Sequence, residues 1–397
     1  METQTPVKIR GAARSPSVSE KSNFSGASFA GLTVCVVGPH YPRPGGVSTQ
    51  VEMLESCLRD EGATVRPVDT NVQPLRRLGR LGRWLLPAAQ VVLVPARLWR
   101  AVGGADIIHA HLASYWGFYL PMLAVTLIGK LRGVPSVATY HGGKAGEFAA
   151  AHSTSVGALL RRLDALIVLS LFTGRVFEGL GLAPVVIPNV IDQQPFRAAP
   201  PGPGSPRLAN PDRPALLWVK SFDDSGNPGL MIEAFARLRR GLPGATLTMV
   251  GDGPRLPDVR EQAEALAAPV HFAGRVPYSA MARAYDTADI LVISSAVDNQ
   301  PNVLIEGSAC GLPVVATAVG GIPDMVHDGV NALLVAPGDA NALAETILRV
   351  ASDPELASHL GQAAVENAQR YTWARVRGPL AVLYDRVLRQ RLGCEPA

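Results

Sequence analysis

Short apolar runs alternate with stretches of helical periodicity along most of the chain. The first run, LTVCVVG at residues 32–38, is mostly apolar and bounded by glycines, which is typical of a strand buried in a parallel sheet. Residues 50–59 follow with the spacing of an amphipathic helix. Four further runs in the first half are predicted strands, at residues 106–110, 136–140, 165–169 and 185–187.

A second series begins after residues 196–214, whose Pro and Gly content predicts a linker. The apolar runs LLWVK, TLTMVG, VHFAG, DILVIS and PVVAT alternate there with helical stretches such as 229–240 and 281–288. Strand and helix alternating twice over predict an α/β fold of two doubly wound, Rossmann-like domains. Because ligands of such sheets bind at the carboxyl ends of the strands, we expect the active site in the cleft between the domains.

These patterns divide the chain into five segments. Residues 1–28 have no apolar period and predict a disordered leader. We expect an N-terminal domain at 29–200, the linker at 201–214 and a C-terminal domain at 215–372. The final segment, 373–397, contains a helix that could pack on either domain, including a return to the N-terminal one.

Composition narrows the class of protein only a little. Of the 397 residues, 47% are hydrophobic and 18% charged, which is typical of a globular or membrane-associated chain. The net charge of +4 suits a phosphate-bearing ligand or an anionic membrane surface without deciding between them, and we expect no nucleic-acid partner. The four cysteines form no CxxC pair and the N-terminus has no signal-peptide pattern, so we expect a reduced, cytoplasmic protein. No Asp-x-Asp occurs, and we expect neither a metal site nor a cofactor.

Two segments raise the question of a membrane. Residues 107–129 carry no Asp, Glu, Lys or Arg, but their dense apolar part, 118–128, is shorter than the roughly 20 residues of a spanning helix. A buried strand followed by a core helix explains this segment better.

The other segment, residues 70–105, holds no acid and several arginines. Basic side chains next to aromatic and aliphatic ones suit an anionic bilayer surface, or a lipid-pyrophosphate acceptor. The alternative is an ordinary helix with solvated arginines and its apolar face on the core. The residues concerned are Arg76, Arg77, Arg80, Arg83, Arg97, Arg100, Trp84 and Trp99.

The stretch DNQPNVLIEGSACGLPVVA, residues 298–316, places two carboxylates either side of a predicted helix start. Pro301 suits the first turn of a helix, and Gly311 suits its end. Asp298 then lies just before the helix, and Glu306 lies one to two turns inside it. The alternative is that Asp298 only caps the helix and that Glu306 is a surface residue.

At this point the sequence resembles the retaining glycosyltransferases of family 4, which have the GT-B fold. The family pattern E-x7-E has its counterpart in Asp298 and Glu306, followed by GLPVVATAVGGIPD at 311–324 and DGVNALLVAPGD at 328–339. The other matching motifs come in the family's order: GPHYPRPGGVSTQ (38–50), DIIHAH (106–111), TYHGG (139–143), IPNVID (187–192), MVGDGP (249–254) and HFAGRV (271–276).

The resemblance implies transfer of a hexose, with retention and without a metal, from a UDP- or GDP-sugar to a glycan or lipid-linked acceptor, in polysaccharide biosynthesis. The protein must then stabilise a diphosphate leaving group with helix N-termini, loop amides and basic side chains. By resemblance, Glu306 binds the ribose, the loop with Asp298 contacts the sugar, and His141 lies at a sugar hydroxyl or the developing oxocarbenium charge. The remaining residues that it implies are Gly45, Gly46, Lys220, Val276, Asn302 and Val303 for the donor, and His109 and His111 for the acceptor.

This chain departs from the family pattern at three positions. Asp298 stands where the family usually has Glu, and Ser221 and Gly226 stand at the positions of its Arg and Lys. Either Lys220 takes over the phosphate contact, or charge stabilisation is weaker here. A catalytically weak sugar-nucleotide or glycan-binding partner therefore stays open as an alternative, as does an epimerase or hydrolase with the same fold. A dinucleotide dehydrogenase is poorly supported, because no GxGxxG follows either opening strand.

Overall fold

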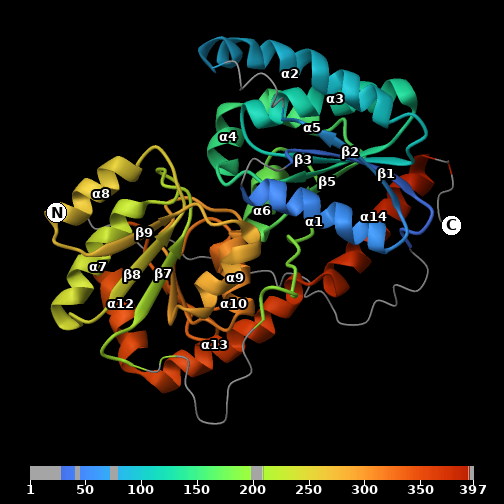
Figure 1. The fold of residues 1–397 in the computed structure, drawn as a ribbon. Helices are drawn as coiled ribbons and strands as arrows, with labels where there is room; N and C mark the ends of the chain where they lie inside the picture. Colours follow the sequence, from blue (N-terminus) through green and yellow to red (C-terminus); the bar gives the residue numbers. More distant parts are fainter. Residues whose placement is uncertain are drawn as a thin grey trace, which may run out of the picture.

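The computed structural model describes residues 28–40, 45–71, 79–197, 208, 210–391 and 393, with the backbone alone for 79–88. The leader, Pro44, Arg76, Arg77 and most of the linker lie outside these residues, as do the side chains of Arg80, Arg83 and Trp84. Within the described part, the chain forms two α/β domains that face one another (Figure 1). The predicted pair of doubly wound domains is confirmed.

The N-terminal domain is built on a six-stranded parallel sheet with the order β2-β1-β3-β4-β5-β6. Its strands are β1 (Thr33–Gly38), β2 (Thr64–Asp69), β3 (Ile107–Leu112), β4 (Ser136–Tyr140), β5 (Ala165–Val168) and β6 (Val185–Val186). Its helices are α1 (Gly46–Asp60), α2 (Gly79–Ala101), α3 (Trp116–Arg132), α4 (Ala145–Ala151), α5 (Ser153–Leu160) and α6 (Leu171–Glu178).

Helices cover both faces of this sheet, which is why its strands are apolar on both sides (Figure 1). Cys35 and Val37 of β1 belong to the core under α2, α3 and α5. Val34 and Val36, pointing the other way, belong to the core under α1 and α14 (Trp373–Arg391).

The C-terminal domain repeats the plan with a six-stranded parallel sheet of order β12-β11-β10-β7-β8-β9. Its strands are β7 (Ala215–Val219), β8 (Thr246–Val250), β9 (Val270–Gly274), β10 (Ile290–Ile293), β11 (Val314–Thr317) and β12 (Leu333–Val335). Its helices are α7 (Pro228–Gly241), α8 (Leu256–Ala265), α9 (Tyr278–Asp286), α10 (Asn302–Ala309), α11 (Ile322–Met325), α12 (Ala340–Ser352) and α13 (Pro354–Ala368), with a 3-10 turn at Gln369–Tyr371.

Helix α14 packs on the N-terminal domain, the choice that the sequence pattern left open. Its Leu380, Tyr384 and Val387 lie in the same core as Phe29 and the β1 residues. At its start, Arg377 forms a two-pronged ion pair with Glu61, at 2.7 and 2.5 Å. Figure 1 shows the helix running from beneath one domain to the other.

The chain thus crosses between the domains twice, and the two crossings touch. The first crossing contains Ile191, whose backbone N–H donates to the carbonyl oxygen of Tyr371 at 2.8 Å. Tyr371 and Thr372 belong to the second crossing, just before α14. The two crossings are therefore hydrogen-bonded to one another.

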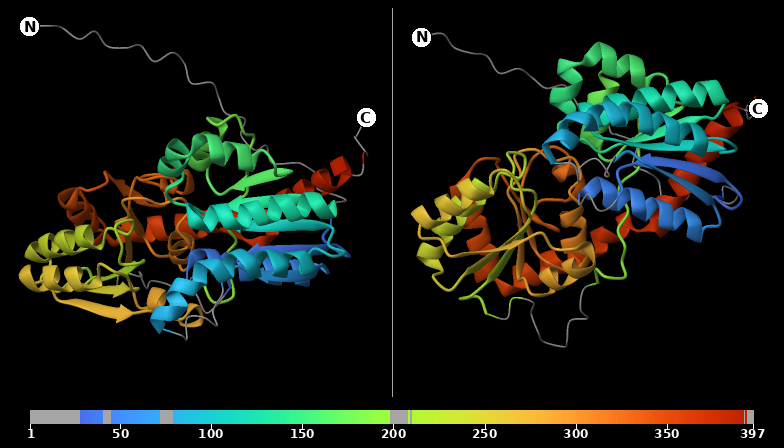
Figure 2. Two further views of the ribbon diagram at one scale, coloured as in Figure 1. Left: turned by 90° about the horizontal axis from the view of Figure 1, so that it is seen from above. Right: turned by 45° about the horizontal axis from the view of Figure 1, so that its top comes forward.

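Helix α3 differs from the core helix expected at residues 118–128. Its inner face is buried, but four apolar side chains lie on an outer face that the described residues leave uncovered: Trp116 (85% exposed), Leu123 (52%), Leu127 (61%) and Leu131 (65%). Helix α2 lies beside it (Figure 2) and exposes Val91, Val92 and Trp99. Of the helices that the structure describes, none combines the length and apolarity that a bilayer-spanning segment needs.

Candidate active site

A cleft of about 460 Å³ lies between the domains, where the carboxyl ends of both sheets converge. The strand order reverses between β1 and β3 in one sheet and between β7 and β10 in the other, which are the positions where doubly wound sheets bind ligands. The lining residues include these from the predicted set: Gly45, Gly46, His141, Lys220, Val276, Asp298, Asn302 and Val303.

Lys220 and Asp298 form an ion pair at the C-terminal switch point. Lys220 follows β7 and Asp298 follows β10, and these strands are neighbours in the sheet. Lys220 Nζ donates to Asp298 Oδ2, which also accepts from Ser295 Oγ at 3.2 Å. The sequence predicted both residues in the site but not their pairing with each other. Asp298 does not cap α10, because its carboxylate accepts from Lys220, Ser295 and the N–H of Asn299, which lies before the helix.

The loop that carries Asp298 is held close to two glycines. Gly320 has φ +54, and a Cβ there would lie 1.7 Å from the carbonyl oxygen of Asp298. A Cβ on Gly321 would lie 2.0 Å from the carbonyl oxygen of Asn299. Only glycine fits at either position, which explains the Gly-Gly pair of the VGGIP motif.

The next residues of this loop bind the N-terminal domain. Gln300 accepts from the backbone N–H of Asn189 at 2.7 Å and donates to the carbonyl oxygen of Leu169 at 2.9 Å. Asn302 Oδ1 accepts from Asn189 Nδ2 at 2.9 Å. We call this set of inter-domain contacts the clasp. Its members in the C-terminal domain are Asn299, Gln300 and Asn302. Its members in the N-terminal domain are Gln50, Ser170, Thr173, Asn189 and the carbonyl group of Leu169.

Helix α10 begins one residue later than expected. Pro301 is the N-cap, with an extended ψ of 118°, and not the first helical residue. Its carbonyl oxygen accepts from the N–H of Leu304 at 3.1 Å, so this N–H is not open to a ligand. Asn302 and Val303 remain at the wall of the cleft. The helix end predicted from Gly311 is confirmed. Helix α10 ends at Ala309, and Gly311 has a φ of +76°.

Glu306 is buried behind the wall of the cleft, one turn after Asn302 and Val303. It is not among the residues that line the cleft, and burial also rules out the alternative of a surface residue. Tyr285 donates to Glu306 Oε2 at 2.6 Å. Burial raises the pKa of the Glu306 carboxyl to about 7, although the hydrogen bond from Tyr285 opposes that shift. The ribose contact stays a prediction.

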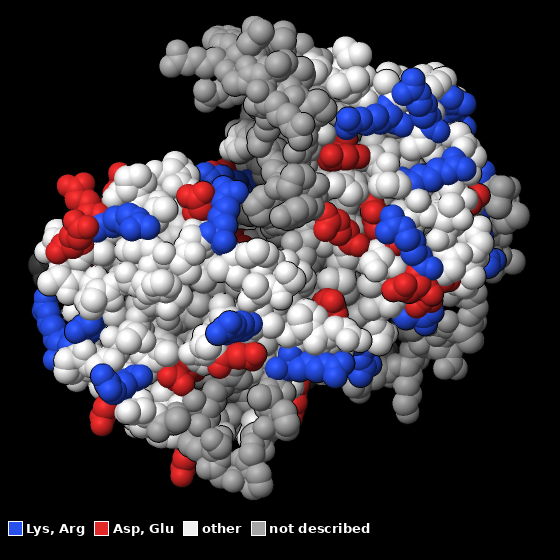
Figure 3. Space-filling model, in the orientation of Figure 1, with Lys and Arg blue, Asp and Glu red and all other residues white. Residues whose placement is uncertain are grey.

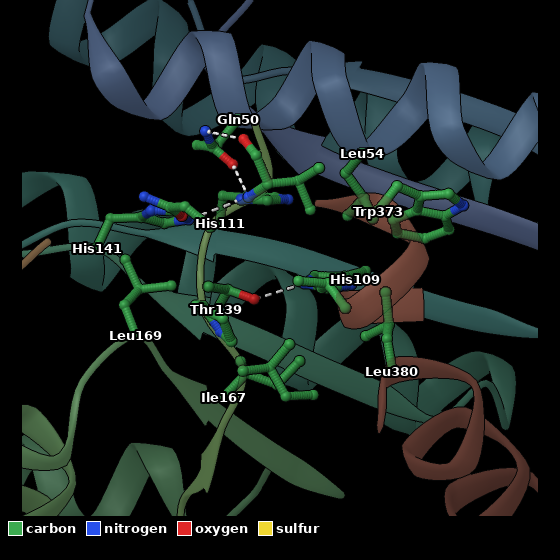
Figure 4. A pocket seen from close by; sticks show the side chains of 15 residues that line it. Gln50, Leu54, His109, His111, Thr139, His141, Ile167, Leu169, Trp373 and Leu380 are labelled. Atoms are coloured by element: carbon green, nitrogen blue, oxygen red, sulfur yellow. Dashed lines mark hydrogen bonds between the residues drawn. The ribbon is translucent and has the colours of Figure 1, made fainter. Parts of the chain in front are cut away.

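The three predicted histidines differ in position. His141 lines the cleft, while His109 and His111 line a smaller cavity of about 40 Å³ beneath it (Figure 4). His109 is held by Tyr384 of α14 at 2.6 Å and by Thr139 at 2.7 Å. Both ring nitrogens of His109 are therefore occupied inside the domain. The structure does not bring His109 or His111 to the cleft, where an acceptor contact was expected.

Several cleft residues were missed by sequence reasoning. Arg275 lines the cleft and pairs with Asp252 at 3.0 Å. Both stand inside matched motifs, HFAGRV and MVGDGP, which could have indicated them. Gln300 and Asn189 also line the cleft, but their partners lie in the opposite domain, and no local pattern signals such a pairing.

Two Rossmann-like domains with a cleft between their carboxyl edges define the GT-B class of fold. Known structures agree. HepE from Anabaena, crystallised with UDP and glucose, superposes with a TM-score of 0.68 at 19% identity, over 92% of this chain and all of that one. Sucrose-phosphate synthase from Thermosynechococcus elongatus gives a TM-score of 0.70 at 23% identity over the same share of each chain. These similarities concern the fold.

Sequence comparison identifies the family. Residues 44–194 match the model of glycosyltransferase family 4, and residues 213–353 match that of the group 1 glycosyl transferases. A phosphatidyl-myo-inositol mannosyltransferase of Mycolicibacterium smegmatis is 27% identical over 87% of this chain and 91% of that protein. A glycogen synthase of Mycobacterium tuberculosis is 30% identical over 72% of this chain and 69% of that protein. The chain belongs to the group 1, family 4 glycosyltransferases, and it is an enzyme of class EC 2.4.

Proposed function

We propose that this glycosyltransferase moves a sugar from a nucleotide-sugar donor to a glycan or lipid-linked acceptor, with retention and without a metal. The observation that carries the proposal is the position of Lys220 and the start of α10, both at the cleft and at the switch point of the sheet. The volume of the cleft, about 460 Å³, is in the range of small-molecule sites. Related structures that bind UDP or UDP-glucose favour a uridine nucleotide, with a guanosine nucleotide as the other candidate.

The side chains of the cleft suggest how the leaving group is stabilised. A diphosphate gains negative charge as the glycosyl bond breaks, and it needs positive potential in a fixed place. Lys220 supplies a cation and the first turn of α10 supplies backbone dipoles. Arg275, which directly follows β9, supplies a second cation at the wall of the cleft. His141, with a pKa lowered to about 4 by burial, is a neutral hydrogen-bonding group for the sugar.

The charge balance of the cleft is the reason to keep the alternative function, a catalytically weak protein that binds a sugar nucleotide or a glycan. Both cations are already paired with aspartates, Lys220 with Asp298 and Arg275 with Asp252. A donor must therefore compete with Asp298 for Lys220, or share it. This competition favours either weak donor binding or a binding protein that turns over slowly.

One experiment separates these functions. UDP-, GDP- and ADP-sugars are tested for binding by calorimetry and for slow donor hydrolysis, with and without EDTA. We expect binding and hydrolysis of one nucleotide class, undiminished by EDTA, and an anomer in the transfer product that matches the donor by NMR. Binding without turnover across a set of acceptors favours the binding partner, and loss of turnover in EDTA contradicts metal independence.

The second part of the proposal concerns an anionic membrane surface. Helices α2 and α3 together expose the apolar side chains of Trp116, Leu123, Leu127 and Leu131 next to Val91, Val92 and Trp99. From residue 70 to residue 146 the sequence holds one acid, Asp106, whose carboxylate accepts from the N–H of Thr33. Apolar side chains framed by cations and almost no acids complement an anionic bilayer.

The basic side chains around this face support the same partner. Arg100, Lys130 and Arg132 are exposed, and Arg132 stacks on Trp99 at 3.8 Å from the ring centroid. Figure 3 shows basic side chains gathered on the upper part of the N-terminal domain, where α2 and α3 end. A lipid-linked acceptor would be presented at such a surface.

Flotation with liposomes tests the membrane surface. The double variant Leu127→Ser with Leu131→Ser should lower binding to vesicles containing phosphatidylglycerol by about 30-fold, because each leucine contributes roughly 1 kcal/mol on partial burial. Leu266→Ser, at an exposed leucine of the other domain, is the matched control. No binding of the unmodified protein to these vesicles at low salt contradicts the proposal.

A further inference from the structure

Three histidine rings form a column at the carboxyl ends of β3 and β4. The parallel register pairs His111 with Thr139, so His109, His111, Thr139 and His141 share one face of the sheet. The rings of His109 and His111 stack with centroids 4.9 Å apart, and those of His111 and His141 with centroids 5.0 Å apart. Figure 4 shows the three rings in the order His109, His111, His141. His109 at one end is bonded to Tyr384 of α14, and His141 at the other end lines the cleft.

His111 stands in the middle of the column and reaches the cleft only through His141. Its Nδ1 lies 2.8 Å from His141 Nε2. Its Nε2 is buried and has no hydrogen-bond partner among the described residues. His141 lines both the small cavity and the cleft, and with Nε2 taken by His111, its Nδ1 is the nitrogen available to a ligand.

One proton must lie between the two rings. Burial lowers the pKa of His141 to about 4, and burial with the neighbouring histidines lowers the pKa of His111 well below its usual value. Both rings are therefore neutral at pH 7, and each carries one N–H. Either His111 donates from Nδ1, or His141 donates from Nε2.

The two arrangements differ in what they leave buried. If His141 donates, His111 must carry its proton on Nε2, where the N–H has no partner. If His111 donates, its Nε2 is a bare acceptor, and His141 carries its proton on Nδ1. An unpaired buried N–H is the group that folded proteins tolerate least, so the second arrangement is favoured.

We propose that His111 is a positioning residue: its Nδ1–H holds His141 in the tautomer with the proton on Nδ1, so that His141 presents an N–H donor to the cleft. Oxygen atoms of a sugar or phosphate can accept from this N–H, whereas a bare nitrogen there would repel a phosphate. The link to the reaction rests on the proposed function, but the tautomer itself does not.

The test begins with the tautomer of His141 in the free protein. Nitrogen NMR on histidine-labelled protein distinguishes a protonated ring nitrogen from a bare one, with His141→Gln identifying the signals. We expect the proton on Nδ1 in the unmodified protein and in His111→Asn, whose amide can still donate from the same place. His111→Leu removes the donor, so nothing fixes the proton on Nδ1, and we expect a mixture of the two tautomers of His141. His359→Leu, an exposed histidine on α13, is the control.

Kinetics then tests the consequence. With UDP-glucose and GDP-glucose as donors, His111→Leu should lower kcat/KM for hydrolysis about tenfold, the effect of one lost hydrogen bond, and His111→Asn should restore most of it. A proton on Nε2 of His141 in the unmodified protein overturns the proposal. So does a proton that stays wholly on Nδ1 of His141 in His111→Leu, and so does unchanged kcat/KM in this variant when both tautomers are present. Absence of any turnover with both donors instead counts against the proposed function and leaves the NMR result to decide on the tautomer.

Discussion

The two domains share one fold and present different chemistry to the same cleft. The N-terminal edge offers two glycines and the neutral ring of His141. The C-terminal edge offers Lys220 with Asp298 and Arg275 with Asp252. The residues that follow the strands make this difference, because both domains consist of a six-stranded parallel sheet between layers of helices. The comparison indicates that the C-terminal domain handles the charge of the donor, while the N-terminal domain orients neutral groups and carries the exposed apolar surface.

The two domains differ most in their buried titratable groups. Glu306 of the C-terminal domain is a buried carboxyl group that becomes charged near neutral pH. Burial raises its pKa from 4.5 to about 7, whereas burial lowers the pKa values of His109 and His141 in the other domain and keeps these two rings neutral. Below pH 4.5 the carboxyl is protonated in both folded and unfolded chains. As pH rises from 4.5 to 7 the unfolded chain loses this proton first, so the stabilisation that comes from the proton in the folded state is lost, and the loss is complete above pH 7.

The variant Glu306→Gln should therefore gain stability relative to the unmodified protein by about 3 kcal/mol between pH 4 and pH 8, since each pKa unit corresponds to about 1.4 kcal/mol. Urea unfolding across this pH range measures it, with Glu345→Gln on the surface of α12 as control. The same variant should weaken nucleotide binding if Glu306 holds the ribose. A stability difference that does not change with pH contradicts the raised pKa.

Replacing Lys220 removes one of the two cations that the C-terminal domain places at the cleft. A charged hydrogen bond is worth about 1.5–3 kcal/mol, so Lys220→Met should lower kcat/KM for the donor by about 10- to 150-fold. The double variant with Asp298→Asn removes the carboxylate left without its partner and should regain stability but not turnover. Arg349→Met, an exposed cation of α12, is the control. Turnover restored in the double variant would show that Lys220 serves only to neutralise Asp298.

A variant of Gln300 tests whether the clasp is needed to keep the two domains closed around the cleft. Gln300→Leu leaves the N–H of Asn189 and the carbonyl oxygen of Leu169 unpaired, at a cost of about 1–3 kcal/mol to the closed form. We expect faster hydrogen exchange at Asn189, a larger radius of gyration by X-ray scattering, and a higher KM. Gln262→Leu removes a glutamine that bonds within the C-terminal domain and should leave the radius unchanged. A radius equal to that of the unmodified protein would mean that the clasp does not hold the domains closed.

Asp298→Glu should have the smallest effect, a change in donor preference of a few fold. The added methylene, about 1.5 Å of reach, brings the carboxylate closer to the sugar and alters its pairing with Lys220. Competition between UDP-sugars that differ at one hydroxyl measures this preference. Unchanged selectivity and turnover would remove Asp298 as the origin of specificity.

The fold was predictable from sequence because buried parallel strands are continuous apolar runs. Residues 136–140 were predicted as a strand and form β4 with the same bounds. Strand β2, TVRPVD, was missed because it lies at the edge of the sheet and is only partly buried. Pro67 is tolerated there for the same reason, since an edge strand pairs on one side only.

The site was less predictable, because its geometry depends on contacts between distant segments. The motif placed Lys220 and Asp298 in the cleft, but their ion pair spans 78 residues, and the contact of Gln300 with Asn189 spans 111. His109 and His111 occur in a matched motif, yet one is tied to Tyr384 and the other to His141. Local spacing indicates which residues gather at a strand end, and tertiary packing decides which of them face the ligand.

The return of α14 to the N-terminal domain has a consequence for biosynthesis. Phe29 and Val34 share one core with Leu380, Tyr384 and Val387, so this core closes only after the ribosome has synthesised and exposed α14. The C-terminal domain draws its two cores from residues 191–371 and can close them earlier. We therefore expect the domain that is translated first to finish folding last, with one face of its sheet uncovered until α14 has been made.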